Sequence, residues 1–239
     1  MNYSHRAYLN TLEILAWQQR NPRAADSTPA CPRLPDWASL QSRVAACTAC
    51  GLHSSRTQTV FGTGSRTASL MVIGEAPGFH EDQQGEPFVG RAGQLLTAML
   101  KSIGFERSQV YIANILKCRP PNNRDPQPEE VAQCTPFLDQ QIILIQPDVI
   151  LAVGRIASHY LLKTRSSLES LRGKVHSYSD RQIPLIVTYH PAYLLRNPID
   201  KKKAYVDLRF ARTLLQPSGA STNGTIPLSA QQTLSRTQT

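Results

Sequence analysis

Four short apolar runs restrict the folds open to this chain more than any other feature of its sequence. They occupy residues 69–73, 110–115, 148–153 and 184–189, and most of their residues are Val, Ile, Leu or Ala. Segments with apolar residues at helical spacing lie between them. Strands that are apolar on both faces are typical of a parallel sheet with helices on both sides. We therefore predict an α/β fold of three layers, α/β/α, with a central four-stranded, mainly parallel sheet.

Composition divides the chain of 239 residues into three parts. Residues 1–38 combine a short helical pattern with a Pro-rich stretch, which predicts a peripheral N-terminal segment and a linker. Residues 39–215 contain all of the predicted strands and form the predicted domain. From residue 216 on, the chain is rich in Ser, Thr, Gly and Gln, so we predict a disordered tail over 216–239.

The formal net charge of +9 indicates an anionic partner. Nucleic acid is the first candidate, and an anionic membrane surface is the second. No apolar run approaches the roughly 18 residues that a membrane-spanning helix needs, and residues 1–6 lack the apolar core of a signal peptide. We expect a soluble, cytoplasmic protein that has no membrane partner.

The segment 74–93 links the first predicted strand to the next helix and is rich in Gly and Pro. Gly lets backbone amides approach a ligand closely, although such a segment can also be a plain connector. Three chemically useful side chains follow the ends of strands: Glu75, Asn114 and His190. Ligands of open α/β sheets bind at the carboxyl edge of the strands, so we expect these side chains to share one crevice.

Five cysteines in a chain without an export signal argue against a disulfide framework. Cys47 and Cys50 form a C-x2-C pair, and Cys118 and Cys134 follow much later. Thiolates at this spacing are compatible with an iron–sulfur cluster or with zinc, and the alternative is that Cys118 and Cys134 are an incidental and a buried thiol. Cys31 lies in the linker and is left out of the predicted site.

Five motifs follow one another between about residue 40 and residue 215. They are Gly74–Gly78 (GEAPG), Gly85–Leu96 (GEPFVGRAGQLL), Asn114–Pro121 (NILKCRPP), Cys134, and His190–Leu195 (HPAYLL). In this combination the chain resembles the type-4 uracil-DNA glycosylases, the iron–sulfur class of the uracil-DNA glycosylase superfamily. The resemblance implies an enzyme of base excision repair that flips uracil out of DNA and hydrolyses its N-glycosidic bond, leaving an abasic site.

The resemblance also implies roles for individual residues. Phe88 would stack on the flipped uracil, and Asn114 would read it by accepting from N3–H and donating to O4. His190 would donate a hydrogen bond to uracil O2, where negative charge develops. Glu75 would either activate the attacking water or stabilise the cationic sugar. A 4Fe–4S cluster with a structural role would be held by four ligands: Cys47, Cys50, Cys118 and Cys134.

Further implied assignments concern the wall of the pocket and the DNA. Gly74 belongs to the uracil pocket, and Glu81 would lie near uracil C5 and help to exclude the methyl group of thymine. Leu194 occupies the position of an apolar wedge that enters the vacated base stack. Three basic side chains are expected to contact DNA: Lys117, Arg119 and Arg196.

Two other functions are open on the residues alone. A non-catalytic, metal-containing nucleic-acid-binding protein would explain the net charge of +9 and the cysteines. An electron carrier would explain a cluster, but it would leave Glu75, Asn114 and His190 without a purpose. For the glycosylase we expect a monomer that acts on single- or double-stranded DNA containing uracil, followed by enzymes that repair abasic sites.

Overall fold

The computed structural model describes residues 36–179 and 181–216. Only residues 36–38 of the predicted N-terminal segment and linker fall within these ranges. Cys31 and all but the first residue of the predicted tail lie outside the described residues.

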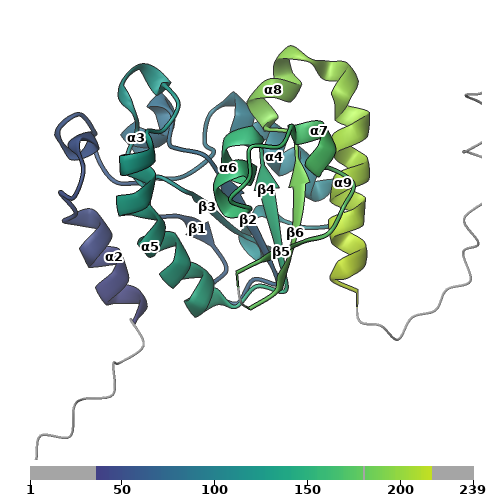
Figure 1. Ribbon diagram of the computed structural model, residues 1–239, viewed down its shortest axis with the longest axis horizontal. Coiled ribbons are helices and arrows are strands. Elements are labelled where there is room, and N and C mark those ends of the chain that lie inside the picture. Colours follow the sequence, from purple (N-terminus) through teal and green to yellow (C-terminus); the bar gives the residue numbers. More distant parts are fainter. Residues whose placement is uncertain (1–35, 180, 217–239) are drawn as a thin grey trace, which may run out of the picture. The chain divides into compact units, whose positions relative to one another are not determined.

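A six-stranded sheet in the order β1-β3-β2-β4-β6-β5 forms the centre of the fold (Figure 1). The strands are β1 (Thr63–Gly64), β2 (Leu70–Gly74), β3 (Tyr111–Asn114), β4 (Val149–Val153), β5 (His176–Tyr178) and β6 (Ile183–Thr188). Strands β3, β2, β4 and β6 are parallel, which confirms the four predicted strands. The predicted strand number is too low because antiparallel β1 and β5 flank them. Both edge strands are too short and polar to carry an apolar pattern.

The described residues also form α-helices and short 3-10 helices. The α-helices are α2 (Trp37–Ala45), α3 (Phe79–Gln84), α4 (Arg91–Lys101), α5 (Pro128–Ile145), α6 (Arg155–Leu161), α7 (Leu168–Leu171), α8 (Pro191–Arg196) and α9 (Lys201–Leu214). The 3-10 helices are η1 (Gly51–Ser54), η2 (Arg107–Gln109), η3 (Pro121–Asn123) and η4 (Pro198–Asp200). None of the helices in the described ranges has the length and apolar character to cross a membrane.

Alternate residues of the central strands point into two separate apolar clusters. In β2, Met71 and Ile73 belong to the cluster that contains Leu138 of α5, whereas Leu70 and Val72 belong to the cluster that contains Leu96 of α4. The first cluster also includes residues of α6, and the second includes residues of α9. Because successive side chains of a strand face opposite sides, each face of the sheet needs its own layer of helices. The three-layer α/β/α prediction is therefore confirmed.

The segment 74–93 is more regular than its sequence indicates. It contains helix α3, whose C-cap Gly85 has φ 75° and ends the helix in the left-handed conformation. Asp82 of α3 is buried and accepts hydrogen bonds from the Thr57 backbone N–H, at 3.0 and 3.1 Å. The helix was not predicted because its side chains after Phe79 are polar, and because it is held by Thr57, which lies 25 residues before Asp82.

Candidate active site

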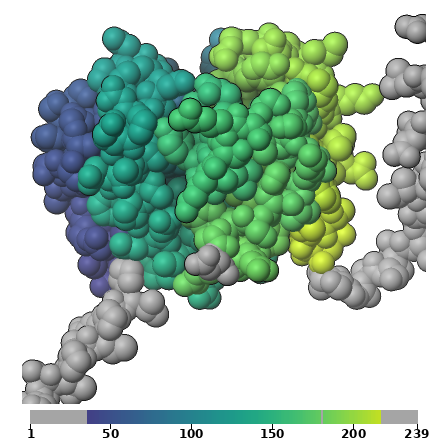
Figure 2. All heavy atoms as spheres, in the orientation of Figure 1, coloured from purple at the N-terminus to yellow at the C-terminus, as the bar shows by residue number. Residues whose placement is uncertain are grey.

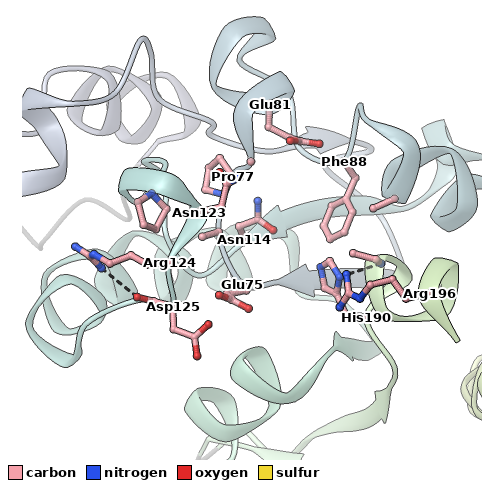
Figure 3. A pocket seen from close by; sticks show the side chains of 15 residues that line it. Glu75, Pro77, Glu81, Phe88, Asn114, Asn123, Arg124, Asp125, His190 and Arg196 are labelled. Carbon is pink, nitrogen blue, oxygen red and sulfur yellow. Dashed lines mark hydrogen bonds between the residues drawn. The ribbon is translucent and has the colours of Figure 1, made fainter.

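A pocket of about 460 Å³ opens at the carboxyl ends of β2, β3 and β6 (Figure 3). Glu75 follows β2, Asn114 ends β3, and His190 lies two residues after β6. All three side chains line the pocket, and Figure 3 shows them around a common space. The parallel strands therefore bring together residues that are far apart in the sequence, as their positions after the strands predicted.

The floor of the pocket contains an unused hydrogen-bond acceptor. Asn114 is only 2% exposed, and its Oδ1 has no hydrogen-bond partner among the described residues. A buried carbonyl oxygen without a partner costs free energy, so such a group in a pocket is a candidate for ligand binding. Gly74 on the neighbouring strand provides the space, because a Cβ atom there would lie 2.4 Å from Oδ1 and 2.6 Å from Cζ of Phe88.

Phe88 is held in an unusual backbone conformation at the wall of the pocket. Its φ is 55°, which is rare for a side chain of this size. Gly93 makes the conformation possible, because a Cβ atom there would overlap the Phe88 carbonyl oxygen at 1.7 Å. Arg107 donates a hydrogen bond to the carbonyl of Pro87, just before Phe88. The ring centroids of Phe88 and His190 are 5.7 Å apart.

The His190 ring is neutral and can donate one hydrogen bond. The backbone N–H of Ala192 donates to its Nδ1 at 3.1 Å, so Nδ1 carries no proton. Burial lowers the pKa of His190 to about 4, with a smaller effect from Arg196. At neutral pH the ring therefore has its single proton on Nε2. Gly154 gives the ring its room, because a Cβ atom there would approach the Cβ of His190 to 2.9 Å.

Glu75 has a pKa that suits proton transfer near neutral pH. Burial and, to a smaller extent, the neighbouring charge of Asp125 raise the pKa of its carboxyl group to about 7, and Arg155 opposes the shift. Asp125 lines the same pocket and pairs with Arg155, with Nη2 and Oδ2 3.2 Å apart. A general base is most effective when its pKa lies near the working pH.

Glu81 lines the pocket and holds part of its wall. Its Oε1 accepts hydrogen bonds from the backbone N–H groups of Val89 and Gly90, at 3.0 and 3.2 Å. These two residues directly follow Phe88. The carboxylate of α3 therefore fixes the chain that carries the aromatic ring.

Two of the predicted DNA contacts are wrong. Lys117 is 1% exposed, and its Nζ donates to the Asn114 carbonyl and to Gln141 Oε1 inside the protein. Leu194 is 0% exposed and packs in the apolar cluster of α4 and α9, because α8 turns this side chain inward. The next residue, Leu195, is 36% exposed and borders a shallow hollow with Arg196.

Arg196 and Arg119 lie at the rim of the pocket. Arg196 is exposed and lines the pocket itself. The guanidinium of Arg119 stacks 5.1 Å from the ring centroid of Phe79, and its Nε donates to Asn123 Oδ1 at 2.7 Å. Asn123 also lines the pocket.

Sequence reasoning missed the contribution of the segment after Pro121. Asn123, Arg124 and Asp125 all line the pocket, although they lie well beyond the end of β3. Gly154 was also missed. The sequence signal that could have found this segment is the polar, Pro-rich composition of 119–128, which follows the strand that ends at Asn114.

The four described cysteines come together on one side of the sheet. They line a small depression with Arg56, and none of them is in a disulfide. Arg56 Nη1 donates to Cys118 Sγ at 3.1 Å, and the Lys117 backbone N–H donates to Cys134 Sγ at 3.2 Å. Burial raises the pKa of Cys134 to about 11 and raises that of Cys118, and the neighbouring cysteines add to both shifts.

This set of cysteines could hold a metal centre. A bound metal would compensate the charge of buried thiolates such as those of Cys118 and Cys134. Over the described ranges, however, no group of three or more Cys, His, Asp or Glu side chains is arranged around one ion position. Four cysteine ligands are compatible with zinc and with an iron–sulfur cluster.

A second cavity, of about 600 Å³, lies between α5, α6 and β5. Figure 2 shows this side of the molecule, with α5 in teal beside the green segment that contains α6 and β5. Its lining is largely aliphatic, and its carboxylate Asp139 already accepts a hydrogen bond from Tyr178 at 2.5 Å. The smaller pocket around Asn114 is therefore the stronger candidate for chemistry.

Comparisons with known proteins identify the family of this chain. Residues 61–212 match the family model of the uracil DNA glycosylase superfamily. A type-4 uracil-DNA glycosylase of Sulfurisphaera tokodaii is 44% identical over 182 residues, which cover 73% of this chain and 83% of the relative. Type-4 uracil-DNA glycosylases of Thermotoga maritima and Archaeoglobus fulgidus are 43% and 45% identical, over 75% and 65% of this chain and 95% and 81% of the relatives.

The match spans β1 to α9 and so includes the strand ends that carry Glu75, Asn114 and His190. Most of each relative's length is covered as well. The chain belongs to the uracil-DNA glycosylase superfamily and, within it, to the type-4 uracil-DNA glycosylases.

Proposed function

We propose that this protein excises uracil from DNA by hydrolysing the bond between the base and deoxyribose. The observation that carries the proposal is the unpaired Oδ1 of Asn114 at the floor of the pocket. Uracil N3–H would donate to this oxygen, and the Asn114 amide N–H would donate to uracil O4. Cytosine has an acceptor at N3 and a donor at C4, so it would leave both groups of the amide unpaired.

Phe88 and Gly74 support a planar base at that place. The Phe88 ring would stack on the flipped uracil, and the missing side chain at Gly74 leaves room beside Asn114. Glu81 would keep the wall after Phe88 fixed through Val89 and Gly90. We assign the exclusion of the thymine methyl group to this wall.

The hydrolysis would use His190 and Glu75. As the C1′–N1 bond breaks, its electron pair moves onto uracil, and Nε2–H of His190 would stabilise the charge at O2. The Glu75 carboxylate would accept a proton from the water whose oxygen bonds to C1′. The products are uracil and a strand with an abasic site, which requires further repair enzymes.

The DNA would lie across the rim of the pocket. The net charge of +9 favours binding to phosphates, and Arg196 and Arg119 are placed near the opening. The exposed Leu195 takes the wedge role that the sequence predicted for Leu194. We propose that the protein acts as a monomer on uracil in single- or double-stranded DNA.

We propose a 4Fe–4S cluster as the cofactor, held by Cys47, Cys50, Cys118 and Cys134. When bound, it would supply four strong bonds that join the segment after α2, the loop after β3 and α5. No step of the hydrolysis uses it.

An excision assay tests the proposal. Cluster-loaded protein is incubated with an oligonucleotide that has one uracil, and alkali then cleaves the strand at abasic sites. We expect cleavage at the uracil, none in the matched oligonucleotide with thymine, and a loss of roughly 10²-fold or more in Glu75→Gln. Binding of both oligonucleotides without cleavage would instead support a non-catalytic nucleic-acid-binding protein.

A further inference from the structure

Lys117 lies buried between the cysteines and the base-reading end of β3. Its Nζ donates to the Asn114 backbone carbonyl at 2.9 Å and to Gln141 Oε1 at 2.6 Å. Its backbone N–H donates to Cys134 Sγ at 3.2 Å. One residue thus contacts Asn114 on one side and a cysteine of the metal site on the other.

The environment of Lys117 shows which negative groups can balance the positive charge of its ammonium group. Both acceptors of Nζ are neutral, and a buried ammonium group is costly without a compensating anion. Cys134, whose Sγ accepts from the Lys117 backbone N–H, and Cys118 both act on Lys117 electrostatically. Thiolates that bind a metal would therefore stabilise the lysine in its buried position.

Gln141 holds Lys117 in one orientation. Its Nε2 donates to the Phe61 carbonyl at 2.9 Å and to the Tyr111 hydroxyl at 3.1 Å, so its Oε1 is turned toward Nζ. Gln141 is fully buried in α5. The same helix carries Cys134, which makes the lysine contacts part of one rigid unit.

The chain between Asn114 and Cys118 is also bound to the strand that carries the catalytic carboxylate. Backbone N–H groups of Ile115 and Leu116 donate to the carbonyls of Gly74 and Glu75, at 3.0 and 3.1 Å. A shift of this short segment at its cysteine end would consequently move Asn114 relative to Glu75. Recognition groups lose much of their effect when displaced by about 1 Å.

We propose that Lys117 is a positioning residue that couples the cysteine site to uracil recognition, by holding Asn114 in place when the thiolates carry their metal. The proposal rests on the proposed function. It assigns to the lysine a role in base selectivity, and none in contact with DNA or with the reacting atoms.

The test compares Lys117→Met with Lys101→Met, an exposed lysine that pairs with Glu106. Binding is measured with oligonucleotides that contain either 2′-fluoro-2′-deoxyuridine, which resists hydrolysis, or 2′-deoxycytidine. Iron per chain and the rate of iron loss to a chelator are measured on the same samples. In Lys117→Met we expect the preference for uracil over cytosine to fall roughly tenfold, the effect of one charged hydrogen bond, with unchanged affinity for the cytosine strand.

We also expect faster iron loss from Lys117→Met, and wild-type values for Lys101→Met. A general loss of structure would weaken both affinities and leave their ratio unchanged. Should Lys117→Met fail to fold, Gln141→Leu removes one acceptor and retains the charge, and it should reduce the ratio by a smaller factor.

An unchanged ratio in a folded, iron-containing Lys117→Met protein would overturn the inference. If Lys117→Met does not fold, an unchanged ratio in Gln141→Leu would do the same. A wild-type protein without any preference for uracil would instead contradict the proposed function, so the two failures are distinguishable.

Discussion

Asn114 Oδ1 occupies the space in which residue 74 would carry a side chain, since a Cβ atom there would lie 2.4 Å away. Gly74→Ala must therefore displace the Asn114 amide or the Phe88 ring. We expect kcat/KM for uracil excision to fall by about 10²-fold or more. Gly51→Ala is the matched control, because a Cβ atom at that position meets nothing within 4 Å and activity should be retained. Wild-type activity in Gly74→Ala would show that the base binds elsewhere.

Asn114→Asp should alter base selectivity. A protonated Asp carboxyl donates from one oxygen and accepts at the other, which matches N3 and the amino group of cytosine. We expect excision of cytosine from a mismatched duplex to become detectable, while uracil excision falls by roughly 10²-fold or more. The measurement is release of each base from otherwise identical oligonucleotides. Unchanged selectivity would mean that Asn114 does not read the base.

The pH dependence of excision should report the protonation of Glu75. Its pKa is raised to about 7, so the active carboxylate is lost as the pH falls through 7, and kcat/KM should fall with it. Asp125→Asn removes a neighbouring negative charge and should move this acidic limb to lower pH. Arg155→Gln removes the opposing positive charge and should move the limb to higher pH. Identical profiles in all three proteins would exclude Glu75 as the titrating group.

Truncation of the two adjacent leucines in α8 should affect different properties, namely stability for Leu194 and excision from duplex DNA for Leu195. Leu194→Ala empties a fully buried site and should lower the free energy of unfolding by about 2–5 kcal/mol. Leu195→Ala should change it by less than about 0.5 kcal/mol, because the side chain is exposed. Excision from double-stranded DNA should instead fall, roughly tenfold, in Leu195→Ala if this residue is the wedge. Urea denaturation and duplex excision assays separate the two effects.

Cys118→Ser should remove one proposed ligand of the cluster. We expect less iron per chain, loss of the brown colour of an iron–sulfur protein, and a lower yield of folded protein, because metal binding contributes to folding. The comparison is wild-type protein purified without oxygen. Wild-type protein that contains zinc and no iron would contradict the cluster assignment.

The apolar pattern of the sequence was sufficient to predict the central strands, because β2, β3, β4 and β6 are buried on both faces. Burial of this kind leaves a continuous run of apolar residues that is readable without a structure. The edge strands β1 and β5 leave no such run, since solvent reaches them. Helix α3 also lacks a readable apolar pattern, because it is anchored by the hydrogen bonds between Asp82 and Thr57 and not by an apolar face.

The sequence alone determined the types and order of the site residues: an acid, an amide and a histidine at strand ends, and four cysteines. Only the tertiary structure decided which way the other candidates point. Lys117 was expected on the DNA and is buried next to Asn114, and Leu194 is buried whereas Leu195 is exposed. The tertiary structure also brought Asp125 and Glu75 into the same pocket. Local composition fixes what a side chain can do, whereas its exposure and neighbours depend on the packing of elements that are distant in the chain.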